Sequence, residues 1–337
     1  MHATDPRRQL LLDWLENDVG QAVDDLRPAS SDASFRRYFR VFSGSETHIA
    51  MDAPPPRENV RPFIAVADRL SRVGVQTPAI LASDVERGFL LLSDFGNCSY
   101  LDALTPQTAP ALYGDALDTL LSLQRGVPTE GSDLPRYDER LLLTELGVFR
   151  EWFLAQWLEL SLSEAEQQVL ASTERVLVDS ALEQPRVCVH RDYHCRNLMV
   201  TERANPGVLD FQDAVIGPIT YDLASLLRDC YIAWPEPQVY AWMDAYRDRL
   251  MTAGLLSGEQ VGRFRRWFDL MGLQRHLKAV GIFARLKMRD DKPGYLKDIP
   301  RTLGYVTAVG QQYPELADFI ALLDRRVWPR LTAESRA

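Results

Sequence analysis

The spacing of apolar positions in the first part of the chain predicts a small lobe that combines helices with a sheet. Apolar residues recur every three or four positions over 5–18 and again over 63–74, which predicts two amphipathic helices. Gly74 provides a helix end for the second of them. Short runs rich in aromatic and β-branched residues, bounded by turn-forming residues, predict strands at 35–42, 48–51, 80–82 and 89–92. Residues 1–93 are therefore expected to form one sheet-containing lobe.

A polar segment that contains glycine follows at 94–98 and is expected to act as a hinge. From 99 to 337 the pattern becomes mainly helical, with long amphipathic stretches at 106–124 and 140–160. The sequence Ser163-Glu164-Ala165-Glu166 reads as a capping box that opens a further helix. A short β-rich island lies within this helical part, at 186–200 and 207–211. The expected fold class is α+β: an N-terminal β-sheet lobe, a hinge and a larger helical lobe.

The composition narrows the class of protein. The 337 residues are 46% hydrophobic and 25% charged, with 38 Lys and Arg against 47 Asp and Glu. A net charge of -9 argues against a nucleic-acid partner, because phosphate contacts need a basic face. No apolar run approaches the ~18 residues of a membrane span, and acidic residues interrupt the N-terminal leucines, unlike a signal peptide. We expect a cytoplasmic protein without a membrane partner, and a monomer.

A zinc site has to be considered because Cys188, His190, His194 and Cys195 lie close together in the sequence. The spacing of the two histidines matches H-x-x-x-H, but Arg191 stands where a zinc protease carries its glutamate. The spacing of the four residues matches no common structural zinc site. A loop without zinc is the better interpretation.

The same segment carries a pattern suited to phosphoryl transfer. An apolar strand leads into His190-Arg191-Asp192, Asn197 follows five positions after the aspartate, and a second strand delivers Asp210. A kinase needs a carboxylate to accept the proton of the acceptor hydroxyl, and an amide oxygen with a carboxylate to hold Mg²⁺. A lone aspartate after a strand is more often a turn residue, but the combined spacing favours catalysis by Asp192. His190 is expected to be a core residue that holds the loop.

These motifs resemble the aminoglycoside phosphotransferase and choline kinase superfamily, relatives of protein kinases, over nearly the whole chain. The segments Ser31–Arg40, Met51–Pro55 and Asp94–Gly96 are more closely similar to the bacterial amino-sugar anomeric kinases. The resemblance implies a protein kinase-like bilobal fold that uses ATP and Mg²⁺. It also implies that the substrate is an amino sugar, N-acetylmuramate or N-acetylglucosamine. The 1-hydroxyl would be phosphorylated, and the product would feed UDP-N-acetylmuramate in peptidoglycan recycling.

The resemblance also implies roles for individual residues. Asp192 becomes the catalytic base, and Asn197 and Asp210 become the magnesium ligands. The residues that would cover the phosphates or hold the adenine edge are Ser31, Asp32, Ala33, Ser34, Phe35, Asp94, Phe95 and Gly96. One departure is clear: kinases carry a phosphate-binding lysine where this chain reads Ile49-Ala50-Met51-Asp52. Arginines of the preceding strand could supply the missing cation, and of Arg36, Arg37 and Arg40 we prefer Arg37.

Contacts with the acceptor are expected from residues near the β island and on the C-terminal helices: Arg191, His194, Asp213, Trp234 and Arg275. For three of them, Asp213, Trp234 and Arg275, a purely structural role is the alternative. Trp234 suits core packing as well as a sugar platform, and Asp213 and Asp222 suit support of the metal site or a helix cap. The many basic residues of 263–289 are read as a solvated helix face.

Two other functions remain open. One is a kinase of the same superfamily that acts on an aminoglycoside, choline or homoserine. The other is a nucleotide-binding pseudokinase scaffold, which the missing lysine suggests and the presence of Asp192, Asn197 and Asp210 opposes. The many arginines after residue 98 suit the carboxylate of N-acetylmuramate better than a cationic acceptor.

Overall fold

The structure, a computed structural model, describes residues 5–30 and 35–334. The chain divides into two compact units. The first contains Met1–Leu123 and Arg196–Asp213, and the second contains Gln124–Cys195 and Ala214–Ala337. The units thus do not follow chain order as the predicted lobes did, because a late segment packs with the N-terminal part. The hinge at 94–98 stays a prediction.

The first unit is built on a five-stranded antiparallel sheet with the order β1-β2-β3-β5-β4. The strands are β1 (Asp25–Ser30), β2 (Arg37–Ser43), β3 (Glu46–Asp52), β4 (Ile80–Asp84) and β5 (Phe89–Ser93). The four predicted strands are confirmed. The edge strand β1 was not predicted, because Pro28 and a polar sequence hide its pairing with β2.

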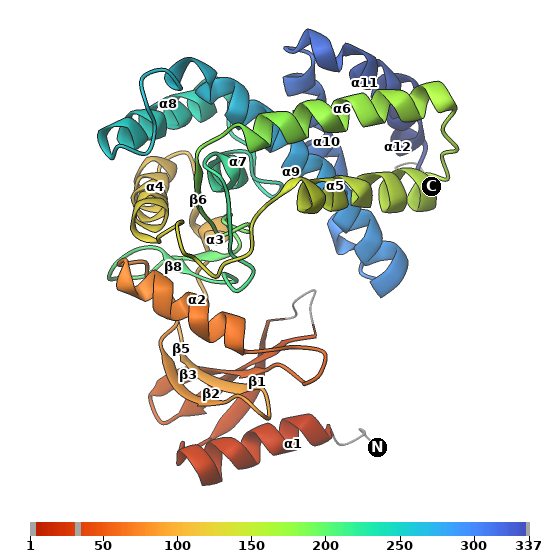
Figure 1. Cartoon of the computed structure of the whole chain (residues 1–337). Coiled ribbons are helices and arrows are strands. Elements are labelled where there is room, and N and C mark those ends of the chain that lie inside the picture. Colours follow the sequence, from red (N-terminus) through yellow and green to blue (C-terminus); the bar gives the residue numbers. More distant parts are fainter. Residues whose placement is uncertain (1–4, 31–34, 335–337) are drawn as a thin grey trace. The chain divides into compact units, whose positions relative to one another are not determined.

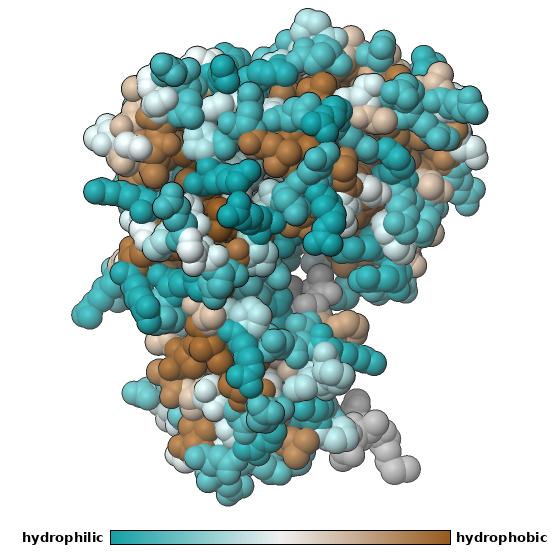
Figure 2. Space-filling view, in the orientation of Figure 1, coloured by the Kyte–Doolittle hydropathy of each residue, from teal (hydrophilic) through white to brown (hydrophobic). Residues whose placement is uncertain are grey.

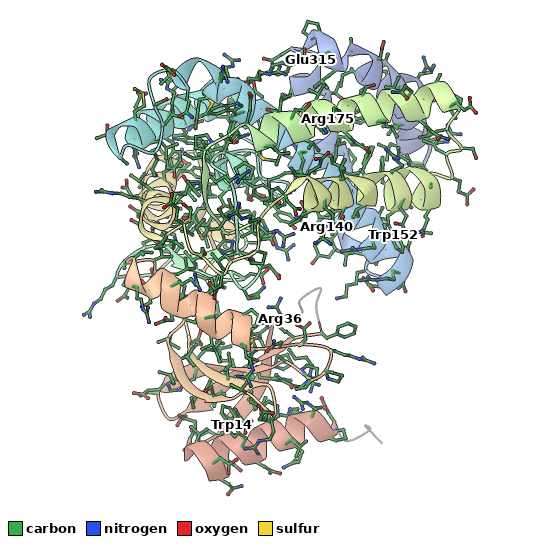
Figure 3. All side chains as sticks on the ribbon, viewed as in Figure 1. Trp14, Arg36, Arg140, Trp152, Arg175 and Glu315 are labelled. Carbon is green, nitrogen blue, oxygen red and sulfur yellow. The ribbon has the colours of Figure 1, made fainter. Side chains whose placement is uncertain are left out.

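Two helices cover this sheet from opposite sides (Figure 1). Helix α1 (Pro6–Asp13) continues as the π-helix η1 (Trp14–Val19) and packs an apolar stripe against one face. Trp14 lies there with its ring centroid 5.7 Å from that of Phe89 (Figure 3). Helix α2 (Arg61–Arg72) lies on the other side and buries Phe63. The unit also contains α3 (Tyr100–Ala103) and most of α4 (Ala109–Gly126).

The segment 196–213 belongs to the first unit because its hairpin is fixed there by hydrogen bonds and close packing. Strands β7 (Leu198–Met199) and β8 (Gly207–Val208) pair with each other. The backbone N–H of Val208 donates to the carbonyl of Gln76 at 2.7 Å. A Cβ on Gly207 would stand 2.6 Å from the Phe95 ring, so only glycine allows this approach. The rings of Phe63 and Phe211 lie 4.7 Å apart.

The second unit is mainly helical and is organised around α9 (Val261–Asp290), which is 30 residues long. Other helices pack on it: α5 (Glu139–Val148), its π-helical continuation η2 (Phe149–Trp157), α6 (Glu164–Leu182), α7 (Tyr221–Leu227), α8 (Glu236–Thr252) and α10 (Ile299–Gly310). The predicted capping box at Ser163 is confirmed. A small sheet pairs β6 (Arg186–Val189) with β9 (Val215–Pro218).

The C-terminal part of this unit continues with shorter helices: η3 (Pro293–Asp298), η4 (Pro314–Leu316), α11 (Ala317–Leu322), η5 (Leu323–Val327) and α12 (Trp328–Glu334). Across the described residues, none of the helices combines the length and apolar character that a membrane crossing requires. Polar side chains cover much of the visible surface, interrupted by smaller apolar areas (Figure 2). The sheet and the helices together confirm the α+β class.

Candidate active site

The loop that carries Asp192 follows strand β6 in the second unit. The backbone N–H of Asp192 donates to Nδ1 of His190 at 3.2 Å, and the His190 side chain is fully buried. His190 therefore holds the loop, as predicted. Arg191 has a φ of +79°, a left-handed conformation that residues other than glycine seldom adopt and that is concentrated at functional sites.

Two buried carboxylates fix the backbone of this loop. Asp222 of α7 accepts hydrogen bonds from the N–H groups of His190 at 2.6 Å and Arg191 at 3.0 Å. Asp229 accepts from the N–H of Cys195 at 2.9 Å. Burial raises the pKa of Asp222 to about 7 even though both N–H groups favour its charged form. Asp222 is not a helix cap, since α7 begins after Thr220 and has no side-chain cap hydrogen bond. It holds the loop, and support of the metal site by Asp222 stays a prediction.

A buried polar cluster adjoins Arg191, and we call it the Glu145 cluster. Its centre is Glu145 of α5, which is 5% exposed. The carboxylate pairs with Lys278 at 2.8 Å and with Arg191, and it accepts from the hydroxyl of Tyr137. Burial alone would raise the pKa of Glu145, but the charges of Lys278 and Arg191 outweigh it and lower this pKa to about 2. One carboxylate thus serves two cations whose side chains are only 20% and 14% exposed.

Arg275 of α9 lies beside the same cluster. Its guanidinium stands 5.2 Å from the centroid of the Tyr221 ring, and the Tyr221 hydroxyl accepts from Lys278 at 3.2 Å. Arg275 is 8% exposed, its Nε has no hydrogen-bond partner, and it forms no ion pair within the described parts of the chain. Both cations of α9 affect the candidate base. Burial raises the pKa of Asp192, but the nearby charges, Lys278 first among them, lower it below its usual value.

The prediction of a solvated basic face on 263–289 is therefore wrong for these two residues. Lys278 is 14% exposed at its side chain and Arg275 is buried. The prediction of a solvated face is correct for Arg263 and Arg265, whose side chains are 65% and 57% exposed. The difference arises because the long helix α9 is surrounded by other helices over its central turns.

The predicted metal ligands both lie in the first unit, and the β7–β8 hairpin brings their backbones together. The N–H of Leu209 donates to the carbonyl of Asn197 at 2.9 Å, which places Asp210 next to Asn197. Asp210 has a φ of +60°, and its carboxylate accepts from the side-chain amide of Gln212 at 2.8 Å. Gln212 also donates to Asp213 at 3.3 Å. An amide oxygen and a carboxylate are donors that suit Mg²⁺.

Within residues 5–30 and 35–334, no three His, Cys, Asp or Glu side chains are placed so that they could share a zinc ion. Cys188 and Cys195 are both buried free thiols.

The three arginines near the start of β2 have different surroundings. Arg37 donates to the buried carboxylate of Asp52 at 3.0 Å and also pairs with Asp5, so two carboxylates share its charge. Arg40 donates to Asp94 at 2.6 Å and to the carbonyl of Gly96 at 2.9 Å. Both arginines therefore tie structural elements together, which argues against the expectation that Arg37 binds nucleotide phosphates.

Arg36 has different neighbours, and these belong to the candidate site. Its Nη2 lies 3.7 Å from Oδ1 of Asp210, and its Nε lies 3.9 Å from Oε2 of Glu58. Phe35, its neighbour, is 59% exposed and donates its N–H to Glu58 at 3.1 Å. The other four residues of the expected phosphate cover, Ser31, Asp32, Ala33 and Ser34, lie outside the described residues.

The hinge residues mainly hold one another. The N–H of Gly96 donates to Asp94 at 2.8 Å, its carbonyl accepts from Arg40, and the Phe95 ring packs against Gly207. Any adenine contact by Asp94, Phe95 and Gly96 stays a prediction, and for Gly96 the structure shows both backbone groups engaged within the hinge.

Among the remaining acceptor candidates, His194 begins a row of aromatic rings. The ring centroids of His194 and Tyr231 lie 5.4 Å apart, and the ring centroid of Tyr231 lies 6.3 Å from that of Phe283 of α9. Trp234 forms an edge-to-face pair with Trp242 of α8 at 5.7 Å, which is the packing alternative considered for it.

Three residues that lie beside the candidate site residues were not identified from the sequence: Glu58, Glu145 and Lys278. A signal for Glu145 was present: it occupies a position on the apolar stripe of its helix, between the buried Leu142 and Phe149. A charged residue on the buried face of a helix is almost always paired with other polar groups. Glu145 at this position therefore indicates a buried polar cluster.

Comparison with known proteins adds three findings. Residues 25–256 match the sequence profile of the phosphotransferase enzyme family. The N-acetylmuramate/N-acetylglucosamine kinase of Pseudomonas aeruginosa is 51% identical over 302 residues, covering 89% of this chain and 88% of that protein. The kinase of the same name from Pseudomonas putida is 45% identical over 329 residues, covering 95% and 96%.

Solved structures share the fold at low sequence identity. The choline kinase LicA from Streptococcus pneumoniae superposes with a TM-score of 0.62 and 10% identity, over 90% of this chain and 100% of that one. The gentamicin complex of the aminoglycoside phosphotransferase APH(2")-IIa gives a TM-score of 0.61 and 15% identity, over 90% and 97%. These likenesses confirm the predicted kinase-like fold class.

Proposed function

The chain belongs to the phosphotransferase enzyme family, and from this premise we propose that it is an ATP-dependent amino-sugar kinase that phosphorylates N-acetylmuramate, N-acetylglucosamine or both. The phosphoryl group goes to the anomeric hydroxyl, and the sugar 1-phosphate serves as a precursor of UDP-N-acetylmuramate in cell-wall recycling. The observation that carries the proposal is the near-full-length likeness to kinases that bear this name. The cytoplasm is where this reaction would meet ATP.

In this reaction Asp192 accepts the proton of the sugar hydroxyl. The hydroxyl oxygen forms a bond to the γ-phosphorus of ATP while the bond from that phosphorus to the ADP oxygen breaks. A base must be unprotonated to do this, and the lowered pKa of Asp192 keeps it a carboxylate at neutral pH. The hydrogen bonds of Asp222 and Asp229 to the loop backbone hold it in place.

Asn197 and Asp210 would hold Mg²⁺. When bound, the ion neutralises charge on the phosphates and so eases transfer. The role of this chain is to present the two oxygens from one hairpin, with Gln212 orienting the carboxylate of Asp210. The hydrogen bond between Leu209 and Asn197 supports the assignment, since it couples the positions of the two ligands.

The charges around Asp192 favour an anionic acceptor over the cationic ones considered above. Arg191 and Lys278 both pair with the carboxylate of Glu145, and Arg275 lies beside them over the Tyr221 ring. An aminoglycoside or choline would meet these cations, whereas the carboxylate of N-acetylmuramate would pair with one of them. Arg275 suits this contact because it is buried and takes part in no ion pair with the residues that the structure describes.

The pseudokinase alternative is disfavoured because Asp192, Asn197 and Asp210 are all present, with Asp192 held as a carboxylate.

The test is a panel of acceptors with ATP and Mg²⁺: the two amino sugars, their C1-blocked glycosides, an aminoglycoside, choline and homoserine. We expect turnover with the free sugars only, and phosphorus coupling to H1 in the NMR spectrum of the product. Turnover of a C1-blocked sugar, or of choline in place of the sugars, would refute the proposal.

A further inference from the structure

The sheet of the first unit lacks a cation where a kinase of this fold would need one for the nucleotide. Met51 occupies that strand position, and it is fully buried. It pairs with Tyr38 of β2 on one side and with Leu90 of β5 on the other. No lysine lies at this point of the sheet, so the triphosphate of ATP must find its positive partner in another side chain.

We propose that Arg36 binds the nucleotide phosphates in place of this lysine, with Glu58 as the positioning carboxylate. This inference rests on the proposed use of ATP and names the residue that grips it. The described neighbours of Arg36 include Asp210, the candidate metal ligand, and Glu58, which precedes α2. Arg37 and Arg40 instead pair with Asp52 and Asp94.

The placement of Arg36 supports this role in two ways. Its side chain is 12% exposed, so its orientation is restricted, and Figure 3 shows it beside one end of α2. Its Nη2 lies 3.7 Å from Asp210 and its Nε lies 3.9 Å from Glu58, so both carboxylates are within ion-pair distance. A guanidinium next to a magnesium ligand is where phosphate oxygens would arrive, and its planar fork matches them.

Glu58 does for Arg36 what a helix glutamate does for the lysine of other kinases: it holds the cation in one orientation. Glu58 also accepts the N–H of Phe35 at 3.1 Å, so the same carboxylate orders the backbone just before Arg36. The two contacts tie Arg36 and its strand to the segment leading into α2.

The test compares the binding of Mg²⁺-ATP and of adenosine to the full chain by calorimetry, without any sugar. Adenosine lacks phosphates, so it reports on the rest of the nucleotide site. We expect Arg36→Gln to weaken ATP binding by at least about tenfold and to leave adenosine binding unchanged. Arg36→Lys keeps the charge and loses the fork, so its loss for ATP is smaller. Glu58→Gln is expected to weaken ATP binding less than Arg36→Gln.

The matched control is Arg27→Gln, which removes an exposed arginine of the neighbouring strand β1 and should bind both ligands as the unchanged chain does. Circular dichroism verifies that each variant is folded. If Arg36→Gln does not fold, the comparison of ATP with adenosine is made with Arg36→Lys. Unchanged ATP binding in the Arg36 variants, or an equal loss for ATP and adenosine, would overturn the inference. A chain that binds ATP through Arg36 but phosphorylates neither sugar would refute the proposed function and leave this inference standing.

Discussion

Replacing Glu145 by glutamine tests whether the Glu145 cluster holds the catalytic loop. The substitution keeps the shape of the side chain but removes the carboxylate that Arg191 and Lys278, themselves only 20% and 14% exposed, share. A pKa lowered from 4.5 to about 2 corresponds to about 3 kcal/mol of stabilisation, and breaking a buried ion pair typically costs about 3–5 kcal/mol. We expect Glu145→Gln to lower the free energy of unfolding by about 3 kcal/mol at pH 7.

The sign of the pH dependence follows from the lowered pKa. A carboxyl group whose pKa falls on folding stabilises the protein above its unfolded pKa of 4.5, and this contribution is lost as the pH falls toward 2. The difference in the free energy of unfolding between the variant and the unchanged chain should therefore have its largest value at pH 7. It should shrink by about 1.4 kcal/mol for each pH unit well below 4.5.

Urea unfolding at a series of pH values, followed by tryptophan fluorescence, measures this difference. Glu139→Gln is the control on the same helix, because its partner Arg175 is 59% exposed and the pair should contribute less than about 1 kcal/mol. Turnover of Glu145→Gln should fall as well, because Arg191 precedes Asp192. A variant as stable as the unchanged chain at pH 7, or a difference that does not change with pH, would refute the reasoning.

Three further outcomes are expected. Asp192→Asn should lower turnover by about 10²–10⁴-fold while ATP binding, measured by calorimetry, persists. Asp210→Asn should instead weaken the Mg²⁺-dependent part of ATP binding. The reverse pattern would show that the roles of Asp192 and Asp210 are assigned the wrong way round. Arg275→Gln should raise KM for N-acetylmuramate by about tenfold and leave KM for N-acetylglucosamine unchanged, and equal losses for both sugars would argue against a contact with the carboxylate. Gly281→Ala should destabilise by about 1–3 kcal/mol in thermal unfolding, because its Cβ would meet the backbone of η2 at 2.6 Å, while Gly262→Ala, with open space around it, should not.

Local features of this protein were predictable from the sequence because they depend on residues close together in the chain. The capping box at Ser163, the end of α2 near Gly74 and four strands of the sheet are of this kind. The spacing of Asp192, Asn197 and Asp210 also pointed to phosphoryl transfer, because that chemistry requires particular side chains at particular intervals.

The choice among the arginines at the start of β2 and just before it could not be made in this way. Arg37 begins β2 and Arg36 directly precedes it, and successive side chains along a strand point to opposite faces. Which of them meets Asp210 depends on where the 196–213 hairpin packs, and which of them meets Asp52 depends on strand pairing with β3. The sequence offered three candidates, of which we preferred Arg37; the packing favours Arg36 instead.

The Glu145 cluster was likewise decided by the tertiary structure alone. Glu145 and Lys278 lie 133 positions apart in the chain, and no local pattern connects them. Burial gives their pairing its strength, since a charge removed from water requires a partner. The sequence by itself thus determined which chemical groups the protein has and in what order, whereas the packing of α5 against α9 decided which of them are buried together.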